Sequence, residues 1–452
     1  MHKLSLSEVV QVTGADCNSD AEIFFDSVTT DSRKVTAGAL FVGLKGENFN
    51  GESFACDAFN KGAIAVLVSR NAKRLPNSIV LKVDDTLDAY RKIAGAWRNR
   101  FDIPIVAVTG SNGKTTTKDL TAAALSGLGH VQKTSGNFNN EVGVPMTLLE
   151  LDDKHNAAVV EIGMRGLGQI ESLAQVVRPT IGIVTNVSEA HIEILGTLDN
   201  IAKAKAELVE AIPAGGTVIL NADNQYTAAM KNFAGTGVNV VTYGLDSDAD
   251  ITAHDVLIGS VSTEFTLVYR GEKHDFEIPM LGRHNVSNAL AAVAAGLTLG
   301  LDIDEIQRGV SSLTTTKMRF EVIRRDGLTI VNDAYNASPA SMRVAIKTAA
   351  EVYSGRLIAV LGDMLELGDI AESVHREIGA ELVENKFDTL ITLGELGKFI
   401  AAGARDAGLK NVYTFDTHED AAKKILEIVR DGDTILFKAS HVMHMDKIIE
   451  LI

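Results

Sequence analysis

The chain has 452 residues, of which 46% are hydrophobic and 23% are charged, the composition of an ordinary soluble globular protein. This length favours about three domains. The formal net charge of −16 argues against nucleic acid or an anionic membrane surface as the main partner, so an anionic substrate would need local basic residues. Cys17 and Cys56 lack metal-ligand and redox spacing, and no apolar stretch reaches membrane-spanning length, which favours a cytoplasmic protein.

Residues 1–84 are predicted to form a small α/β domain. Its clearest elements are a strand at 40–44, a helix at 54–61 and a second strand at 63–68. Gly62 is the expected C-cap of that helix. Basic side chains lie in two connecting segments, Thr30-Asp31-Ser32-Arg33 and Lys45-Gly46-Glu47. Polar loops are usually only solvated, but Arg33 and Lys45 are candidates for binding phosphate.

A glycine-rich loop begins the central segment, between a buried strand at 103–108 and a helix at 114–125. Such a strand, loop and helix form a cradle for phosphate, in which backbone N–H groups point inward. Lys114 supplies a positive charge, and the Thr115 hydroxyl can reach a magnesium ion. The usual P-loop has a further glycine where Val108 stands, so this loop is a shortened variant. The flanking strand and helix favour nucleotide binding over a simple turn.

The rest of the chain predicts two more sheets. In the segment 85–313, β-branched runs at 157–161, 181–185 and 216–220 alternate with helical patterns, which indicates a parallel sheet covered on both faces. An antiparallel hairpin is expected at 264–279 and a long helix from Gly282 to Leu297. The segment 314–452 predicts a Rossmann-like doubly wound sheet, with strands at 328–333, 357–361, 389–393 and 434–437. It carries no dinucleotide-binding fingerprint.

Polar residues gather where the central strands are expected to end. Glu161 ends one strand, where a carboxylate can hold the magnesium that bridges nucleotide phosphates, although it could also be a solvated acid. His191 follows the next strand, and its position is equally compatible with a catalytic and with a structural role. Lys205 lies on a predicted helix, and nothing in its own surroundings distinguishes it from a solvated lysine. The amide-rich segments 137–140 and 332–338 either contact a polar substrate or form turns.

In their order and spacing these segments resemble the Mur ligase family, the ATP-dependent amide ligases that build the peptidoglycan stem peptide. The P-loop sequence Thr109-Gly110-Ser111-Asn112-Gly113-Lys114-Thr115-Thr116 matches the family pattern, including its missing first glycine. The resemblance extends over essentially the whole chain, through the segments 136–149, 160–168, 191–207 and 282–292. Two further segments, 332–342 and 362–368, are similar to the branch that adds D-alanyl-D-alanine.

The resemblance implies an activity and a set of site residues. The activity is the joining of D-alanyl-D-alanine to UDP-N-acetylmuramoyl-tripeptide with ATP and two Mg²⁺ ions, through an acyl phosphate. The implied catalytic residues are Lys114, His191 and Lys205, of which Lys205 would be carbamoylated. The implied ATP-binding residues are Gly110, Ser111, Asn112, Gly113, Lys114, Thr115, Thr116, Asn285, Arg319 and Asp333. The implied metal ligands are Thr115, Glu161, His191 and Lys205. The implied substrate-binding residues are Ser32, Arg33, Lys45, Asn137, Asn139, Asn140, Tyr335 and Asn336.

The resemblance also assigns tasks to the three segments. Residues 1–84 would bind the UDP substrate, 85–313 would bind ATP, and 314–452 would close on the nucleotide and bind the incoming dipeptide. The expected partners are these small molecules alone, with no nucleic acid and no membrane, and the chain is expected to act as a monomer. Two alternatives stay open: a sister ligase with another amino-acid acceptor, and a P-loop regulator that ligates nothing. The chain departs from the family pattern at Glu52, Met318, Ala439 and His441.

Overall fold

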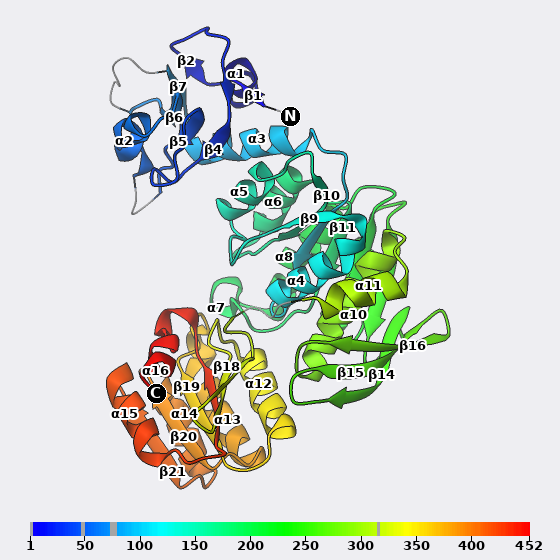
Figure 1. The fold of residues 1–452 in the computed structure, drawn as a ribbon, viewed down its shortest axis with the longest axis vertical. Coiled ribbons are helices and arrows are strands. Elements are labelled where there is room, and N and C mark those ends of the chain that lie inside the picture. The colour runs from blue at the N-terminus through cyan, green and yellow to red at the C-terminus, as the bar shows by residue number, and fades with distance from the viewer. Residues whose placement is uncertain (1–2, 47–49, 73–78, 314–316) are drawn as a thin grey trace.

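The computed structural model of the protein describes residues 3–46, 50–72, 79–313 and 317–452. It has three α/β units that follow one another along the chain, from the N-terminal unit at the top of Figure 1 to the C-terminal unit at the bottom. The predicted fold class is confirmed. Glu47 and the predicted boundary at residue 314 lie outside the described residues. Among the residues described, no helix is both long and apolar enough to span a membrane.

The N-terminal unit is a five-stranded sheet in the order β2-β7-β6-β5-β4, with β2 antiparallel to β7 and the other pairs parallel. A small antiparallel pair, β1 and β3, stands beside it. Its elements are β1 (Leu4–Ser5), α1 (Leu6–Thr13), β2 (Asp16–Cys17), β3 (Phe24–Phe25), β4 (Ser27–Thr29), β5 (Ala39–Val42), η1 (Gly51–Phe54), α2 (Ala55–Asn60), β6 (Ala65–Ser69) and β7 (Ile79–Val83). The helix α3 (Thr86–Arg98), capped by Asp85, then leads into the central unit and contacts α1, α5 and α6.

The central unit is built on a nine-stranded sheet in the order β16-β15-β14-β13-β12-β11-β8-β10-β9. The strands from β9 to β14 pair in parallel, and β14, β15 and β16 form an antiparallel edge that includes the predicted hairpin. Its strands are β8 (Ile105–Thr109), β9 (His130–Lys133), β10 (His155–Glu161), β11 (Ile181–Val184), β12 (Thr217–Asn221), β13 (Asn239–Gly244), β14 (Ile251–Ile258), β15 (Thr263–Tyr269) and β16 (Glu272–Ile278).

Helices cover both faces of the central sheet and bury a hydrophobic core on each. They are α4 (Lys114–Ala124), η2 (Leu125–Leu128), α5 (Gly143–Leu149), α6 (Gln169–Val177), α7 (Ile192–Leu195), α8 (Leu198–Glu210), α9 (Gln225–Ala229), η3 (Met230–Phe233), α10 (Arg283–Thr298) and α11 (Ile303–Ser311). Because both faces are covered, strands such as β8 are buried along their whole length, which is why they read as continuous apolar runs.

The C-terminal unit has a six-stranded sheet in the order β17-β18-β22-β19-β20-β21, parallel except for β17, with a hydrophobic core on each face. Its elements are β17 (Glu321–Arg325), β18 (Leu328–Asn332), α12 (Pro339–Val352), β19 (Leu357–Gly362), η4 (Gly368–Ile370), α13 (Ala371–Glu384), β20 (Thr389–Leu393), α14 (Gly397–Asp406), β21 (Asn411–Phe415), α15 (His418–Ile428), β22 (Thr434–Lys438), η5 (His441–Met443) and α16 (Asp446–Leu451). In Figure 1 this unit lies next to α7 of the central unit.

The structure differs from the sequence-based expectations at the end of one helix and in strands that were not predicted, which in the central and C-terminal units are β9, β13, β14, β17 and β21. The helix α2 ends at Asn60 and is capped by Lys61, so Gly62, at φ +112°, is the residue after the cap and not the cap itself. The strand β14 was not predicted, because its pairing with β15 shifts register between His254 and Leu257. Asp255 in that bulge has φ +52°, and a bulge interrupts the alternation from which a strand is recognised.

Candidate active site

The glycine-rich loop connects β8 to α4 at the carboxyl edge of the central sheet. Gly110 and Gly113 have φ of +149° and +78°, backbone conformations that residues other than glycine rarely adopt. A Cβ atom at Gly110 would lie 1.8 Å from the Thr185 hydroxyl oxygen. Asn186 fixes the loop from β11, because its carbonyl and side-chain oxygens accept hydrogen bonds from the N–H groups of Ser111 and Asn112. The loop is therefore shaped before any ligand binds.

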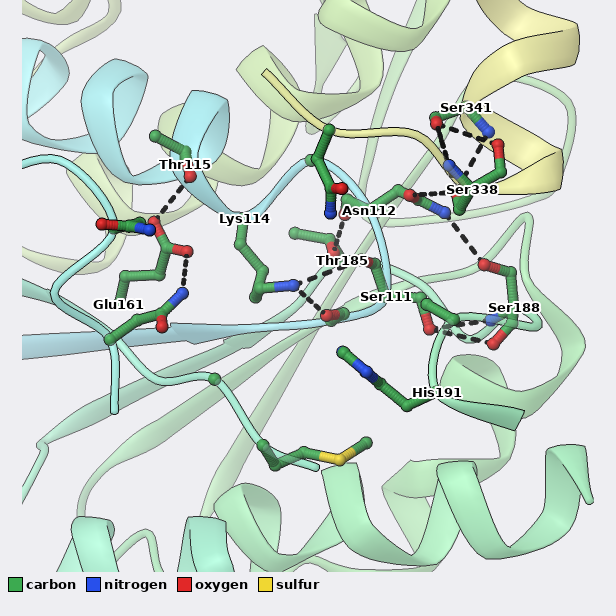
Figure 2. Close-up of a pocket in the computed structure, with 18 of the residues that line it drawn as sticks. Ser111, Asn112, Lys114, Thr115, Glu161, Thr185, Ser188, His191, Ser338 and Ser341 are labelled. Carbon is green, nitrogen blue, oxygen red and sulfur yellow. Dashed lines mark hydrogen bonds between the residues drawn. The ribbon is translucent and has the colours of Figure 1, made fainter. Parts of the chain in front are cut away.

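Lys114 begins α4 and bends back over this loop. Its ammonium donates to the carbonyl oxygens of Gly110, at 2.8 Å, and Ser111, at 3.2 Å (Figure 2). Surrounding protein atoms lower the pKa of this half-buried lysine, and the nearby charge of Arg319 lowers it further, whereas Glu161 opposes the shift. The lysine is thus close to the space above the loop and shares that space with another cation.

A hydroxyl and a carboxylate meet beside the loop. Thr115 donates a hydrogen bond of 2.8 Å to the Glu161 carboxylate, and Asn139 donates to the other carboxylate oxygen at 2.8 Å. Glu161 is almost completely buried, and its backbone N–H donates to the Thr134 hydroxyl. Oxygen ligands of these two types suit Mg²⁺, so Thr115 and Glu161 fit a magnesium site at the phosphates. Thr116, the next residue of α4, is buried.

Lys205 and His191 line the same cavity as the P-loop residues. Lys205 lies on α8 with 1% of its surface exposed, and burial together with the charge of Lys114 holds its pKa well below the usual lysine value. An uncharged amine is the form that carbon dioxide can modify, so the residue fits the predicted carbamate. His191 precedes α7, and burial lowers its pKa while Glu366 opposes that shift. Among the described residues, no group of three or more His, Cys, Asp or Glu side chains is placed to hold a metal ion unaided.

The C-terminal unit supplies the opposite wall of the cavity. Arg319 donates a hydrogen bond of 2.8 Å to the Thr115 hydroxyl, and its guanidinium lies 4.0 Å from the ring centre of Tyr335. Asp333 forms an ion pair of 2.6 Å with the buried Lys438, which also donates to the carbonyl oxygen of Asn336. All of these residues line one cavity of about 1240 Å³ between the central and C-terminal units.

The predicted amides have different surroundings. Asn137, Asn139 and Asn140 all line the cavity, but the Asn140 side chain accepts hydrogen bonds from the N–H groups of Val142 and Gly143. Asn285 also lines it, although its amide donates to the Leu281 carbonyl and accepts from Asn288. The side chain of Asn285 is therefore already bonded within the central unit.

The three predicted residues of the N-terminal unit do not line this cavity. Arg33 is exposed and forms an ion pair of 2.8 Å with Asp31, whose pKa it lowers to about 2. The carbonyl oxygen of Ser32 accepts a hydrogen bond from Lys61, and Lys45 is exposed. The structure thus gathers the predicted nucleotide and metal residues but leaves these three apart from them.

Several cavity residues had no role assigned from the sequence. Ser338, the N-cap of α12, donates a hydrogen bond of 2.8 Å across the cavity to the side-chain oxygen of Asn112 (Figure 2). Glu366 contacts His191, and Lys438 contacts Asp333. His284, beside Asn285, is half-buried, and its Nδ1 atom is buried and unpartnered among the described residues. Desolvation of the ring lowers its pKa to about 4. The segments 332–342 and 362–368 contained Ser338 and Glu366, but their similarity to a family branch did not identify the contacts.

The structure shows the surroundings of the four departures from the family pattern. Met318, where glycine is usual, has φ +61°, a left-handed conformation that glycine adopts freely. Ala439 is fully buried, and a Cβ atom added at Gly362 would lie 2.9 Å from its methyl group. His441 lies 5.3 Å from Tyr335 between ring centres, at the cavity wall. Glu52 accepts a hydrogen bond from the Ser69 N–H and caps that strand end.

Comparison with known proteins gives consistent results over the whole chain. Family models match at 25–98 (Mur ligase family, catalytic domain), 108–296 (Mur ligase middle domain) and 318–441 (Mur ligase, glutamate ligase domain). The UDP-N-acetylmuramoyl-tripeptide–D-alanyl-D-alanine ligase of Bacillus subtilis is 40% identical, with 99% of this chain and 97% of that protein covered. The Escherichia coli protein of the same name is 35% identical, with 99% and 98% covered.

Solved structures agree with these sequence matches. A crystal structure of MurF from Acinetobacter baumannii superposes with a TM-score of 0.92 at 29% identity, covering 100% of this chain and 98% of that one. The MurF ligase of Thermotoga maritima, solved in complex with ADP, superposes with a TM-score of 0.84 at 28% identity, covering 94% and 96%. Both likenesses extend through all three units.

Proposed function

We propose, because the chain belongs to the Mur ligase family, that it is an ATP-dependent ligase that joins D-alanyl-D-alanine to UDP-N-acetylmuramoyl-tripeptide. The observation that carries this proposal is the single cavity in which the P-loop, Lys205 and His191 face Arg319 of the C-terminal unit. Relatives that carry the name of this activity are 32–40% identical over 87% or more of the chain. The small-molecule substrates need no nucleic-acid or membrane surface. The reaction would take place in the cytoplasm, with the chain acting as a monomer.

The first half of the reaction is a phosphoryl transfer. The terminal carboxylate of the tripeptide attacks the γ-phosphorus of ATP, and ADP leaves, so an acyl phosphate forms. Phosphoryl transfer depends on positioning and charge stabilisation more than on covalent help from the protein. The N–H groups of the loop from Gly110 to Gly113 orient the phosphates, and Lys114 balances their charge, releasing its bonds to the loop carbonyls. Arg319 supplies a second positive charge from the other wall.

The metal ligands follow from the surroundings of each residue. Thr115 and Glu161 would hold one Mg²⁺ ion, and His191 and a carbamoylated Lys205 the other, and these ions would supply additional neutralisation of phosphate charge when bound. The carbamate forms when the uncharged Lys205 amine attacks carbon dioxide: a nitrogen–carbon bond forms and one proton is released. Burial favours this step because it lowers the pKa of Lys205 and so disfavours the charged ammonium form.

The second half of the reaction is an acyl transfer. The free amine of D-alanyl-D-alanine attacks the acyl carbon, and inorganic phosphate leaves the tetrahedral intermediate. An acyl phosphate hydrolyses in water, so the contact between the C-terminal unit and the P-loop also serves to exclude solvent. We assign Asn137, Asn139, Asn140, Tyr335 and Asn336 to the peptide substrates, and Ser32, Arg33 and Lys45 to the UDP end. Asn285 and Asp333 are assigned to the nucleotide.

The units have corresponding tasks in this proposal. Residues 1–84 bind the UDP substrate, residues 85–313 bind ATP, and residues 314–452 close on the nucleotide and bind the dipeptide. The separation of Arg33 from the cavity supports an extended substrate, with its nucleotide end in one unit and its peptide end in the next.

A phosphate-release assay tests the proposal. The purified protein receives ATP, Mg²⁺ and a UDP-tripeptide, with D-alanyl-D-alanine, single amino acids or no amine. Release that requires D-alanyl-D-alanine, with the pentapeptide product identified by mass spectrometry, is expected. Release with another amine indicates a sister ligase, and turnover without any amine indicates a regulator. Lysine and diaminopimelate at the third position, used in parallel, identify the tripeptide.

A further inference from the structure

A contact between His191 and Glu366 joins the central unit to the C-terminal unit. The Nδ1 atom of His191 lies 2.5 Å from a carboxylate oxygen of Glu366. The other carboxylate oxygen forms an ion pair of 3.3 Å with Arg165. Glu366 therefore connects two central-unit residues to the segment between β19 and η4, and it is 175 residues away from His191 in the chain.

The backbone on both sides of this contact is held in an uncommon conformation. His191 and Glu366 have φ of +67° and +61°, and neither is a glycine. Residues held in this region cluster at ligand clamps and switch regions, where surrounding packing imposes the conformation. Here the Glu193 N–H donates to the Glu366 carbonyl oxygen at 3.4 Å, and Gly368 packs against the Glu193 side chain. The segment around Glu366 thus contacts the first turn of α7.

The contact leaves the imidazole with one ring nitrogen free. Because Glu366 occupies Nδ1, Nε2 is the nitrogen left for a ligand, and the His191 side chain points toward the P-loop side of the cavity (Figure 2). A carboxylate on one ring nitrogen fixes the tautomer and the ring orientation of a histidine that binds metal through the other. In this protein the carboxylate comes from a different unit, so it can reach the histidine only when the units are together.

We propose that Glu366 is a positioning residue that orients His191 and thereby makes the second metal site complete only in the closed arrangement of the units. This inference rests on the proposed function, because His191 is a metal ligand only within it. The consequence is an order of events: the C-terminal unit must dock on α7 before the site binds Mg²⁺ at full strength. Phosphoryl transfer in an open, water-filled cavity is thereby disfavoured.

The test compares Glu366→Ala and Glu366→Gln with a matched control, Glu372→Ala. Glu372 lies in the same unit, is exposed and pairs with Arg376 at 3.2 Å, and it does not line the cavity. Two measurements need no turnover: calorimetric titration of Mg²⁺ into the protein saturated with a non-hydrolysable ATP analogue and UDP-tripeptide, and solution scattering of the same complex. The third is the Mg²⁺ concentration that gives half-maximal phosphate release.

Loss of an outer-shell partner typically weakens metal binding or activity by about 10- to 100-fold. We expect Glu366→Ala to weaken Mg²⁺ binding within that range and to leave the complex with a larger radius of gyration. Glu366→Gln keeps an acceptor for the imidazole N–H and should show a smaller effect on both, and Glu372→Ala should match the wild type. Unchanged Mg²⁺ binding and scattering in Glu366→Ala would overturn the proposal.

Two controls keep the result interpretable. If Glu366→Ala melts well below the wild type, Glu366→Gln carries the test, and wild-type Mg²⁺ binding in that folded variant would contradict the inference. If the wild type itself shows no amine-dependent phosphate release, the proposed function fails. The Mg²⁺ titration and the scattering still report on Glu366 in that case, because neither needs catalysis.

Discussion

The proposed nucleotide end of the site and the proposed UDP end are built in opposite ways. The P-loop has glycines in restricted conformations, a lysine bonded to its carbonyls, and Thr115 bonded to both Glu161 and Arg319. In the N-terminal unit, Arg33 is 85% exposed at its side chain and is bonded to Asp31 two residues away. One end is organised before its ligand arrives, whereas at the other the ligand must replace an existing exposed contact.

This difference predicts how strongly each end depends on single side chains. Charges fixed in a cavity that excludes water act at low dielectric and need no rearrangement during the reaction. An exposed ion pair is screened by solvent and contributes little. Substitutions around the P-loop should therefore lower kcat severely, whereas substitutions in the N-terminal unit should raise KM modestly.

Lys205→Ala should cause the largest loss. Removal of a metal-held charge is expected to cost several kcal/mol, about a thousand-fold or more in kcat. Lys203→Ala is the matched control, since Lys203 is exposed on the same helix. Phosphate release with and without added acetate is the measurement, and a short carboxylate should restore part of the activity. A Lys205→Ala protein that stays active in bicarbonate-free buffer would disprove the carbamate.

Lys114→Ala should be the next most severe change. Loss of one preorganised charge contact typically costs ~3–4 kcal/mol, or about 100- to 1000-fold in rate. The fold should survive, because the Lys114 side chain donates hydrogen bonds only to carbonyl oxygens of its own loop. An unchanged melting temperature would confirm this. Lys154→Ala, an exposed lysine of the same unit, serves as the control. Near wild-type phosphate release from a folded Lys114→Ala protein would contradict the role of Lys114.

Arg319→Ala tests the wall that comes from the C-terminal unit. A hydrogen bond to a charged group contributes ~1.5–3 kcal/mol, so kcat should fall by about 10- to 100-fold. Steady-state kinetics should show this loss in kcat more than in the KM for ATP, because the P-loop still binds the nucleotide. Arg324→Ala, on β17 and exposed, should behave as the wild type. Equal rates for both variants would mean that Arg319 only bridges the units.

Arg33→Ala should have the smallest effect. Since the guanidinium is exposed and already paired, the KM for the UDP-tripeptide should rise by only about two- to five-fold with kcat unchanged. Lys92→Ala, which removes an exposed partner of Asp88, is the control. A drop in kcat of the size expected for Lys114→Ala would show that the UDP end is as preorganised as the P-loop, and the comparison between the two ends would no longer hold.

The elements that could be predicted were those whose pattern is complete within a short stretch. The strand before the P-loop, the hairpin around Gly271 and four of the six strands of the C-terminal sheet were recognisable, because burial on both faces or turn chemistry leaves a local trace in the sequence. The strand β14 left no such trace, since its bulge at Asp255 breaks the alternation. The end of α2 was misplaced by one residue, because a positive φ at Gly62 fits the position after the cap equally well.

The phosphate cradle could be recognised from the sequence alone, because Gly110, Gly113, Lys114 and Thr115 act through backbone geometry and contacts between near neighbours. Which distant side chains meet that cradle depends instead on how the units pack together. Arg319 reaches Thr115 across 204 positions and Glu366 reaches His191 across 175, and no local pattern encodes such a distance. Those pairs form where the central and C-terminal units meet, so packing between the units selects them.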